Sequence, residues 1–143
     1  MTAVILGLDH VGLATASPGE AGEQLAALGL TRTAGGEADA YGVACEFWSP
    51  SADPGGTAVE LVSPARPGSA VDGRLQERGP GLYHLAFRVD DLEGEAARLR
   101  AAGFLALDAA PCRGARPGMR VTFLYQPEPA ELLVELVHYA TTP

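Results

Sequence analysis

The chain repeats one hydrophobic pattern twice along its 143 residues, and each copy carries the same polar residues. Four segments form two matching pairs: LDHVGL at 8–13 with LYHLAF at 82–87, and VELV at 59–62 with VELV at 134–137. His84 follows His10 by 74 positions (84 − 10), and Glu135 follows Glu60 by 75 (135 − 60). A duplicated fold explains the hydrophobic frame. It does not explain why one histidine and one glutamate recur in register in each half.

The same order of elements is expected in both halves. In the first half, apolar alternation and turn residues predict strands at Leu6–Ala14, Leu30–Thr33, Val43–Trp48 and Thr57–Val62, with a helix at Pro18–Leu28. Pro18 suits the first turn of this helix, Ser17 can cap it and Gly29 can end it. In the second half we expect strands at Leu82–Val89, Phe104–Leu107, Arg120–Gln126 and Leu132–Tyr139, with a helix at Leu92–Ala102.

These elements predict an α+β fold made of paired βαβββ modules. We expect residues 1–66 to form the first module and 82–143 the second, joined by a linker at 67–81 that contains a short helix near Ala70–Arg78. One short sheet with one helix cannot bury both of its faces. Two modules side by side would form a curved, largely antiparallel sheet of eight strands, with helices outside and a concave face left for a metal site.

The repeated histidines and glutamates have the chemistry of metal ligands. Glu60 and Glu135 each lie within a run of valine and leucine, where a carboxylate is rarely buried unless it is paired or bound to a metal. Brought together by the duplication, His10, Glu60, His84 and Glu135 would give two nitrogen and two oxygen ligands for a divalent ion. The third histidine, His138, has no counterpart in the first half and is expected at the surface.

Composition excludes several classes of partner. The net charge of −8 argues against nucleic acid, although Arg113, Arg116 and Arg120 could together hold an anionic small molecule. No apolar run approaches the length of a membrane span, and the N-terminus has no signal-peptide pattern. Cys45 and Cys112 are too few for a disulfide framework, which favours a reduced cytoplasmic setting, and Cys45 is expected to be a small buried residue.

Several longer motifs resemble a known family. They are LDHVGLA at 8–14, VELVSP at 59–64, LQERGPGLYHLAF at 75–87, VDDL at 89–92, GAR at 114–116, VTFL at 121–124 and LVEL at 133–136. In these motifs the chain resembles the vicinal oxygen chelate superfamily (glyoxalase, bleomycin resistance and dioxygenase proteins), and within it the branch that contains methylmalonyl-CoA epimerase. The segment ERGPGLYH and the loop at 114–118 resemble that branch most specifically.

The resemblance implies a site and a cofactor. His10, Glu60, His84 and Glu135 fall on the family's ligand positions, the second of which is Gln or Glu among relatives. The family binds a divalent metal (cobalt, manganese, nickel, zinc or magnesium) and a small-molecule substrate, acyl-CoA compounds included, that chelates it through two oxygens. The resemblance also implies a homodimer.

The implied reaction is an epimerisation or related isomerisation through a metal-stabilised enolate, with one base on each side of the substrate. In the family the metal-bound carboxylate, here Glu135, is one base. The other is a Glu just before the Gly-Val of the third strand, where this chain has Ala40. Tyr41 and Glu46 are our candidates to replace it, with Glu37 and Asp39 also open. Strand parity would place Glu46 with Ala44 and Trp48.

Three alternatives stay open at this point. One is a divergent isomerase, cyclase or lyase of a specialised pathway, and a second is a lyase like glyoxalase I, whose bacterial forms use the same ligand types. The third is a metal-free protein that binds or sequesters a small molecule. A dioxygenase is less favoured, because its iron prefers two histidines and one carboxylate with open positions.

Overall fold

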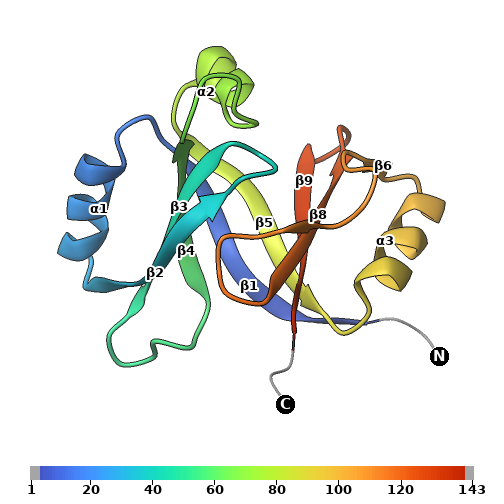
Figure 1. The fold of residues 1–143 in the computed structure, drawn as a ribbon, viewed down its shortest axis with the longest axis horizontal. Helices are drawn as coiled ribbons and strands as arrows, with labels where there is room; N and C mark the ends of the chain where they lie inside the picture. Colours follow the sequence, from blue (N-terminus) through green and yellow to red (C-terminus); the bar gives the residue numbers. More distant parts are fainter. Residues whose placement is uncertain (1–3, 141–143) are drawn as a thin grey trace.

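A computed structural model describes residues 4–140, and in this part of the chain one mixed, curved sheet runs through both halves of the molecule (Figure 1). The first half contains β1 (Ile5–Ala14), α1 (Pro18–Ala27), β2 (Leu30–Ala38), β3 (Val43–Pro50) and β4 (Ala58–Pro64). The second half contains β5 (Gly81–Val89), α3 (Leu92–Ala101), β6 (Leu105–Ala106), β7 (Cys112–Arg113), β8 (Met119–Gln126) and β9 (Leu132–Tyr139). Helix α2 (Asp72–Arg78) joins the two.

The strand order is β2-β3-β4-β1-β5-β9-β8-β6, with β7 paired to β8. At its centre β1 and β5 run antiparallel, while β4 lies parallel to β1 and β9 parallel to β5. The other ladders are antiparallel, as the repeat predicted. The expected α+β class and curved sheet are therefore confirmed. The exact module boundaries at residues 66 and 82 stay a prediction.

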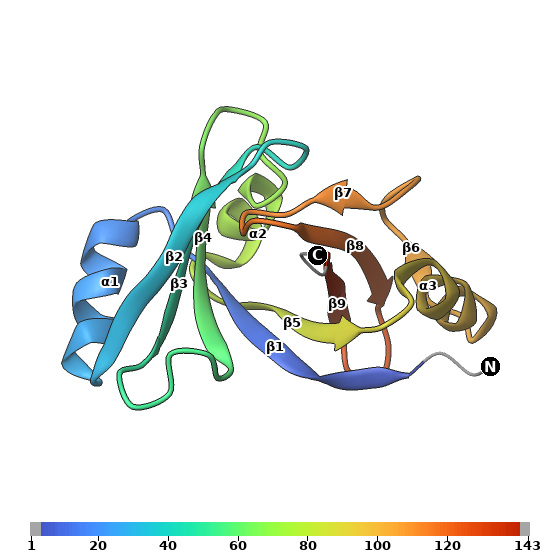
Figure 2. The same cartoon turned by 60° about the horizontal axis from the view of Figure 1, so that its bottom comes forward.

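Helices α1 and α3 lie at the two outer ends of the sheet (Figure 2). Helix α1 starts with Pro18, as expected, but the Ser17 side chain makes no capping hydrogen bond; instead the Ser17 N–H donates to the Thr15 hydroxyl. Gly29 follows the helix with a φ of 97°, a conformation that glycine adopts easily. In α3 the Asp91 carboxylate accepts from the Gly94 N–H and caps the first turn.

Three elements differ from the sequence-based expectation. Strand β2 extends to Ala38, beyond the expected Thr33, because its Gly-rich second half continues to pair with β3. Strand β6 has only two residues, and β7 was not expected at all. Both are short partners of β8, and two-residue strands leave too little alternation to be recognised from sequence.

Two clusters of buried side chains hold the sheet together. The larger one spans both halves and includes Phe47, Val62, Val121 and Val137. The second lies at the end of the sheet that α3 covers and includes Leu92, Leu99, Leu124 and Leu136. Among the described residues no helix has the length and apolar character needed to cross a membrane.

Candidate metal centre

The central strands bring the four predicted ligands into two cross-strand rows. In one row His10 of β1 lies beside Ala86 of β5, which lies beside Glu135 of β9. In the other row His84 of β5 lies beside Gly12 of β1, which lies beside Glu60 of β4. Each row thus places a small residue between a histidine and a glutamate, so the two long side chains can meet above it. All four predicted ligand residues come from one chain.

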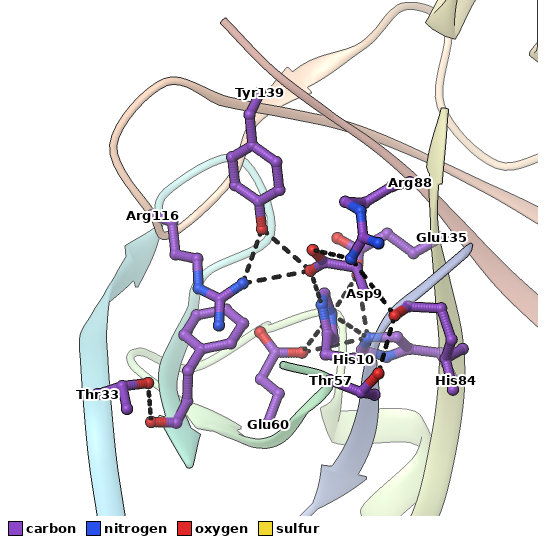
Figure 3. A network of polar contacts seen from close by, with 12 residues as sticks. Asp9, His10, Thr33, Thr57, Glu60, His84, Arg88, Arg116, Glu135 and Tyr139 are labelled. Carbon is purple, nitrogen blue, oxygen red and sulfur yellow. Dashed lines mark hydrogen bonds and ion pairs between the residues drawn. The ribbon is translucent and has the colours of Figure 1, made fainter. Parts of the chain in front are cut away.

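The ligand atoms of the four residues converge on one point (Figure 3). His10 Nε2 lies 2.8 Å from Glu135 Oε1 and 3.1 Å from Glu60 Oε1. His84 Nε2 lies 3.0 Å and 3.1 Å from the same two oxygens. The two histidine Nε2 atoms are 3.3 Å apart. Two ligands at right angles around one ion, each about 2.1 Å from it, would be about 3.0 Å apart, so these separations suit a single divalent metal.

The four side chains are buried, and their charges are strongly coupled. His10 is fully buried, and Glu60, His84 and Glu135 are each 5% exposed. Burial lowers the pKa of His10, but hydrogen bonds to Asp9 and the two glutamates outweigh it and raise that pKa to about 12. The same balance of burial and glutamate contacts raises the pKa of His84 to about 9. Without a metal, the cluster therefore holds protons in place of a cation.

The hydrogen bonding of the nitrogen and oxygen atoms in the cluster also suits a metal. His10 Nδ1 lies 2.6 Å from Asp9 Oδ2, so Nδ1 carries a proton and donates it to the carboxylate. Once the Nε2 proton is released, the lone pair of Nε2 points toward the other three side chains, where a cation can bind. The Glu60 Oε1 atom is buried, and its polar neighbours are the two imidazole Nε2 atoms, each at 3.1 Å. Two histidines and two carboxylates are ligands that zinc and neighbouring divalent ions accept.

Behind His10, a second group of side chains holds the Asp9 carboxylate in place. Asp9 Oδ2 accepts from the Tyr139 hydroxyl at 3.0 Å and from Arg116 Nη1 at 3.3 Å. Arg116 also donates to Tyr139, at 2.8 Å, and its guanidinium lies 3.9 Å from the centroid of the Phe47 ring. Such groups orient a metal-binding histidine and increase its basicity. Sequence reasoning missed them, since alternation along β1 places Asp9 on the face opposite His10.

A cavity of about 210 Å³ opens beside the cluster, and its lining comes from both halves of the chain. Glu60, His84 and Glu135 lie in its wall, while most of the remaining lining is apolar. At one side Tyr41 donates a hydrogen bond of 2.8 Å to Asp108 Oδ2, and the Phe123 N–H donates to the same oxygen at 2.8 Å. Asp108 is thus a further carboxylate in the wall of the cavity, beyond the predicted ligands.

Comparison with known proteins places these features in a family. A family model described as the Glyoxalase/Bleomycin resistance protein/Dioxygenase superfamily matches residues 9–123. The chain belongs to this superfamily. No curated protein matches the sequence of this chain.

Several solved structures are similar to this chain along nearly its whole length. Methylmalonyl-CoA epimerase from Mycobacterium tuberculosis is 31% identical with a TM-score of 0.84, and the match covers 99% of this chain and 93% of that one. A variant of the Streptomyces coelicolor methylmalonyl-CoA epimerase, in complex with 2-nitronate-propionyl-CoA, is 30% identical with a TM-score of 0.82, covering 96% and 100%. A hypothetical protein from Bacillus halodurans is 26% identical with a TM-score of 0.79, covering 95% and 96%.

The structure separates Tyr41 and Glu46, the two residues that the sequence offered as replacements for the Glu missing at Ala40. Tyr41 lies in the cavity wall. Glu46, the other candidate, is not among the residues that line the cavity. Its carboxylate accepts from Trp48 Nε1 at 3.1 Å, and Trp48 packs where a Cβ at Gly22 of α1 would lie. Strand parity had paired Glu46 with Trp48 correctly, but that face of β3 is turned toward α1.

The other residues singled out by sequence also have clear positions. Arg113, Arg116 and Arg120 line a shallow groove, but Arg116 is engaged with Asp9 and Arg120 pairs with Glu93 at 2.8 Å. His138 is half-buried on β9, outside the lining of the cavity. Cys45 is buried as expected, and burial raises the pKa of its thiol. Glu37 and Asp39 are exposed.

Proposed function

We propose that this protein is a metal-dependent epimerase or isomerase that moves a proton at a carbon next to a carbonyl group. The observation that carries the proposal is the convergence of four buried ligand side chains at a cavity that also holds Asp108, a carboxylate outside the ligand set. Support comes from the structural neighbours, which are methylmalonyl-CoA epimerases at about 30% identity. Acyl-CoA thioesters are therefore the first substrates to test.

In this proposal His10, Glu60, His84 and Glu135 hold the metal, and Asp9 keeps His10 in the tautomer that binds it. When bound, a divalent metal supplies a Lewis acid that stabilises negative charge on a substrate carbonyl oxygen. The apolar wall of the cavity excludes water and strengthens such electrostatic contacts.

Two carboxylates are proposed for the proton transfers. Glu135 lines the cavity from β9 and is the base on one side. Asp108 approaches from the segment between β6 and β7 and takes the place of the missing Glu at Ala40. Its Oδ2 atom accepts two hydrogen bonds, and its Oδ1 atom has no hydrogen bond to the described part of the chain, so Oδ1 can take up a proton.

Tyr41 keeps a place in the site as the group that positions Asp108. Burial raises the pKa of the Tyr41 phenol far above its usual range, and the hydrogen bond to Asp108 raises it further. The hydroxyl therefore stays protonated, and it can orient a neighbouring carboxylate but cannot act as a base at neutral pH. This assignment replaces our sequence-based hypothesis that Tyr41 itself is the second base.

A lyase like glyoxalase I is a second candidate, because the two-histidine, two-glutamate set is complete and the proton transfers it needs are the same. A divergent isomerase or cyclase would use the same groups. A metal-free binding protein is less well supported, since such a protein has no need for four buried ligands directed at one point. The homodimer and the cytoplasmic location stay predictions.

The test is proton exchange in deuterated water, followed by NMR, with metal-loaded protein. Methylmalonyl-CoA and 2-methylacetoacetyl-CoA are compared, because both carry one hydrogen and one methyl group on the carbon next to the thioester. We expect metal-dependent exchange of at least one of them, above the uncatalysed background and absent in His84→Ala. Metal-loaded protein that accelerates exchange of neither compound would contradict the proposed activity on such thioesters.

A further inference from the structure

The charged groups of the cavity wall are almost all negative. Three carboxylates line it, those of Glu60, Asp108 and Glu135, and the only basic side chain among its described lining residues is the imidazole of His84. A divalent metal held by Glu60 and Glu135 would be neutralised by these two ligands. Asp108 then leaves the loaded site with one net negative charge.

Asp108 is held firmly in this position. Its Oδ2 atom accepts from the Tyr41 hydroxyl and from the backbone N–H of Phe123, each at 2.8 Å. The Phe123 ring lies edge-on to His84, with 5.3 Å between the ring centroids. Asp108 is therefore hydrogen-bonded to Phe123, the residue that packs against His84. It cannot turn away from the cavity without losing both hydrogen bonds.

No arginine or lysine compensates this charge. The sequence has no lysine, and its ten cationic side chains are all arginines within the described residues. None of them lines the cavity. Arg116, next to the lining residue Ala115, points to Asp9 and Tyr139 and is stacked on Phe47. Its charge is therefore already balanced by the Asp9 carboxylate behind His10.

The rest of the wall offers little to a charged substrate. Val43, Val62, Met119, Val121 and Leu133 supply apolar surface, and the cavity of about 210 Å³ holds only a small group. Moving a carboxylate from water into such surroundings, beside a fixed carboxylate and without a paired arginine or lysine, is unfavourable because the carboxylate loses its hydration and is repelled. A neutral ketone or ester oxygen has a much smaller cost.

We infer that the cavity selects a carbonyl substrate whose reacting end is uncharged, a β-ketoacyl thioester or a related neutral dicarbonyl compound, and that Asp108 is the residue that rejects a substrate carboxylate. The inference rests on the proposed function for the identity of the site. It separates this chain from a methylmalonyl-CoA epimerase, whose substrate carries a carboxylate on the reacting carbon.

Binding of two unreactive thioesters tests the inference apart from catalysis. Dimethylmalonyl-CoA and 2,2-dimethylacetoacetyl-CoA have no hydrogen on the central carbon and differ only in a carboxylate against an acetyl group. Calorimetry with metal-loaded protein should find the neutral compound bound at least about tenfold more tightly. Equal or tighter binding of dimethylmalonyl-CoA, or no binding of either compound, would overturn the inference.

Charge variants test the role of Asp108. Asp108→Asn keeps an acceptor for Tyr41 and Phe123 and removes the charge. It should therefore improve the binding of dimethylmalonyl-CoA and reduce the difference in affinity between the neutral and the charged thioester. The same variant should lose catalytic proton exchange. Glu60→Gln should shift the preference in the same direction. Asp39→Asn removes an exposed carboxylate just outside the lining and is the matched control. A preference that Asp108→Asn leaves unchanged would overturn the assignment of Asp108.

The two proposals fail in different ways. Exchange of methylmalonyl-CoA as fast as that of 2-methylacetoacetyl-CoA would overturn the inference while supporting the proposed epimerase. Exchange of neither compound, with the neutral analogue still bound more tightly in calorimetry, would contradict the proposed reaction and support the charge selection of the cavity.

Discussion

The His84 imidazole lies directly over Gly12 of the neighbouring strand, in the space where the side chain of any other residue would be. A Cβ built on Gly12 overlaps the His84 ring atoms. In the equivalent row, the fully buried Ala86 stands between His10 and Glu135. The size of these intervening residues therefore decides how closely each histidine can approach its glutamate.

Substitution Gly12→Ala should weaken metal binding at least about tenfold, because the added methyl group displaces His84 from the other ligands. Calorimetry with manganese, cobalt or zinc would measure the change. Gly19→Ala is a matched control, since a Cβ on Gly19 in α1 meets no neighbouring atom within 4 Å. Unchanged affinity in Gly12→Ala would show that His84 is not held by this contact.

Metal should stabilise the folded chain, since four ligands distant in sequence meet only in the native state. Metal at about 100 times its Kd adds about 2.7 kcal/mol to the free energy of unfolding. For a chain of this size we expect the melting temperature to rise by about 5–10 °C. Calorimetric melting before and after chelation measures the shift. The same shift in Glu135→Ala would place the metal elsewhere.

Metal affinity should increase with pH throughout the range from 6 to 10, because the metal must displace a proton from both His84 and His10. The pKa of His84 in the metal-free protein is about 9, raised from 6.5, so protons compete with the metal through the neutral range. The raised pKa also means that the protonated form stabilises the metal-free fold below pH 6.5, and that this stability is lost as the pH rises through 9. Measuring metal affinity from pH 6 to 10 checks the competition between protons and metal. Measuring the melting temperature of the metal-free protein over the same pH range checks the effect on stability. A flat affinity profile would contradict this prediction.

Asp9→Asn should reduce metal affinity by about tenfold to a hundredfold, because the amide no longer supplies the negative charge that holds the His10 Nδ1 proton. Tyr139→Phe removes only one donor to Asp9 and should have a smaller effect. Metal titration of both variants gives the ranking. Glu93→Gln, which breaks an exposed pair with Arg120, serves as the control. An effect of Glu93→Gln as large as that of Asp9→Asn would argue for a general loss of stability.

The repeat in the sequence predicted the sheet and the meeting of the four ligand residues, because the same element order in each half places equivalent strands at equivalent positions. Glu46 shows where this reasoning stops. A period of two identifies which residues share a face, but the face that turns toward α1 is decided by packing, here by Trp48 against Gly22.

Asp9 and Asp108 were missed for different reasons. The ladder between β1 and β5 shifts register between Leu8 and His10, and such an irregularity breaks the strict alternation that would place Asp9 on the face opposite His10. Asp108 lies outside the repeated frame, in the segment between two strands of two residues each. Its contact with Tyr41 joins positions 67 residues apart, which no local pattern predicts.

The antiparallel pairing of β1 and β5 has a mechanical consequence. Each ligand row crosses this seam, with His10 reaching a glutamate of the second half and His84 reaching one of the first. An ion bound there would cross-link the two halves of the chain through its ligands. Separating the halves would then require releasing the ion, so the rate of metal loss should set an upper limit on how fast the central seam of the folded, metal-loaded protein can open.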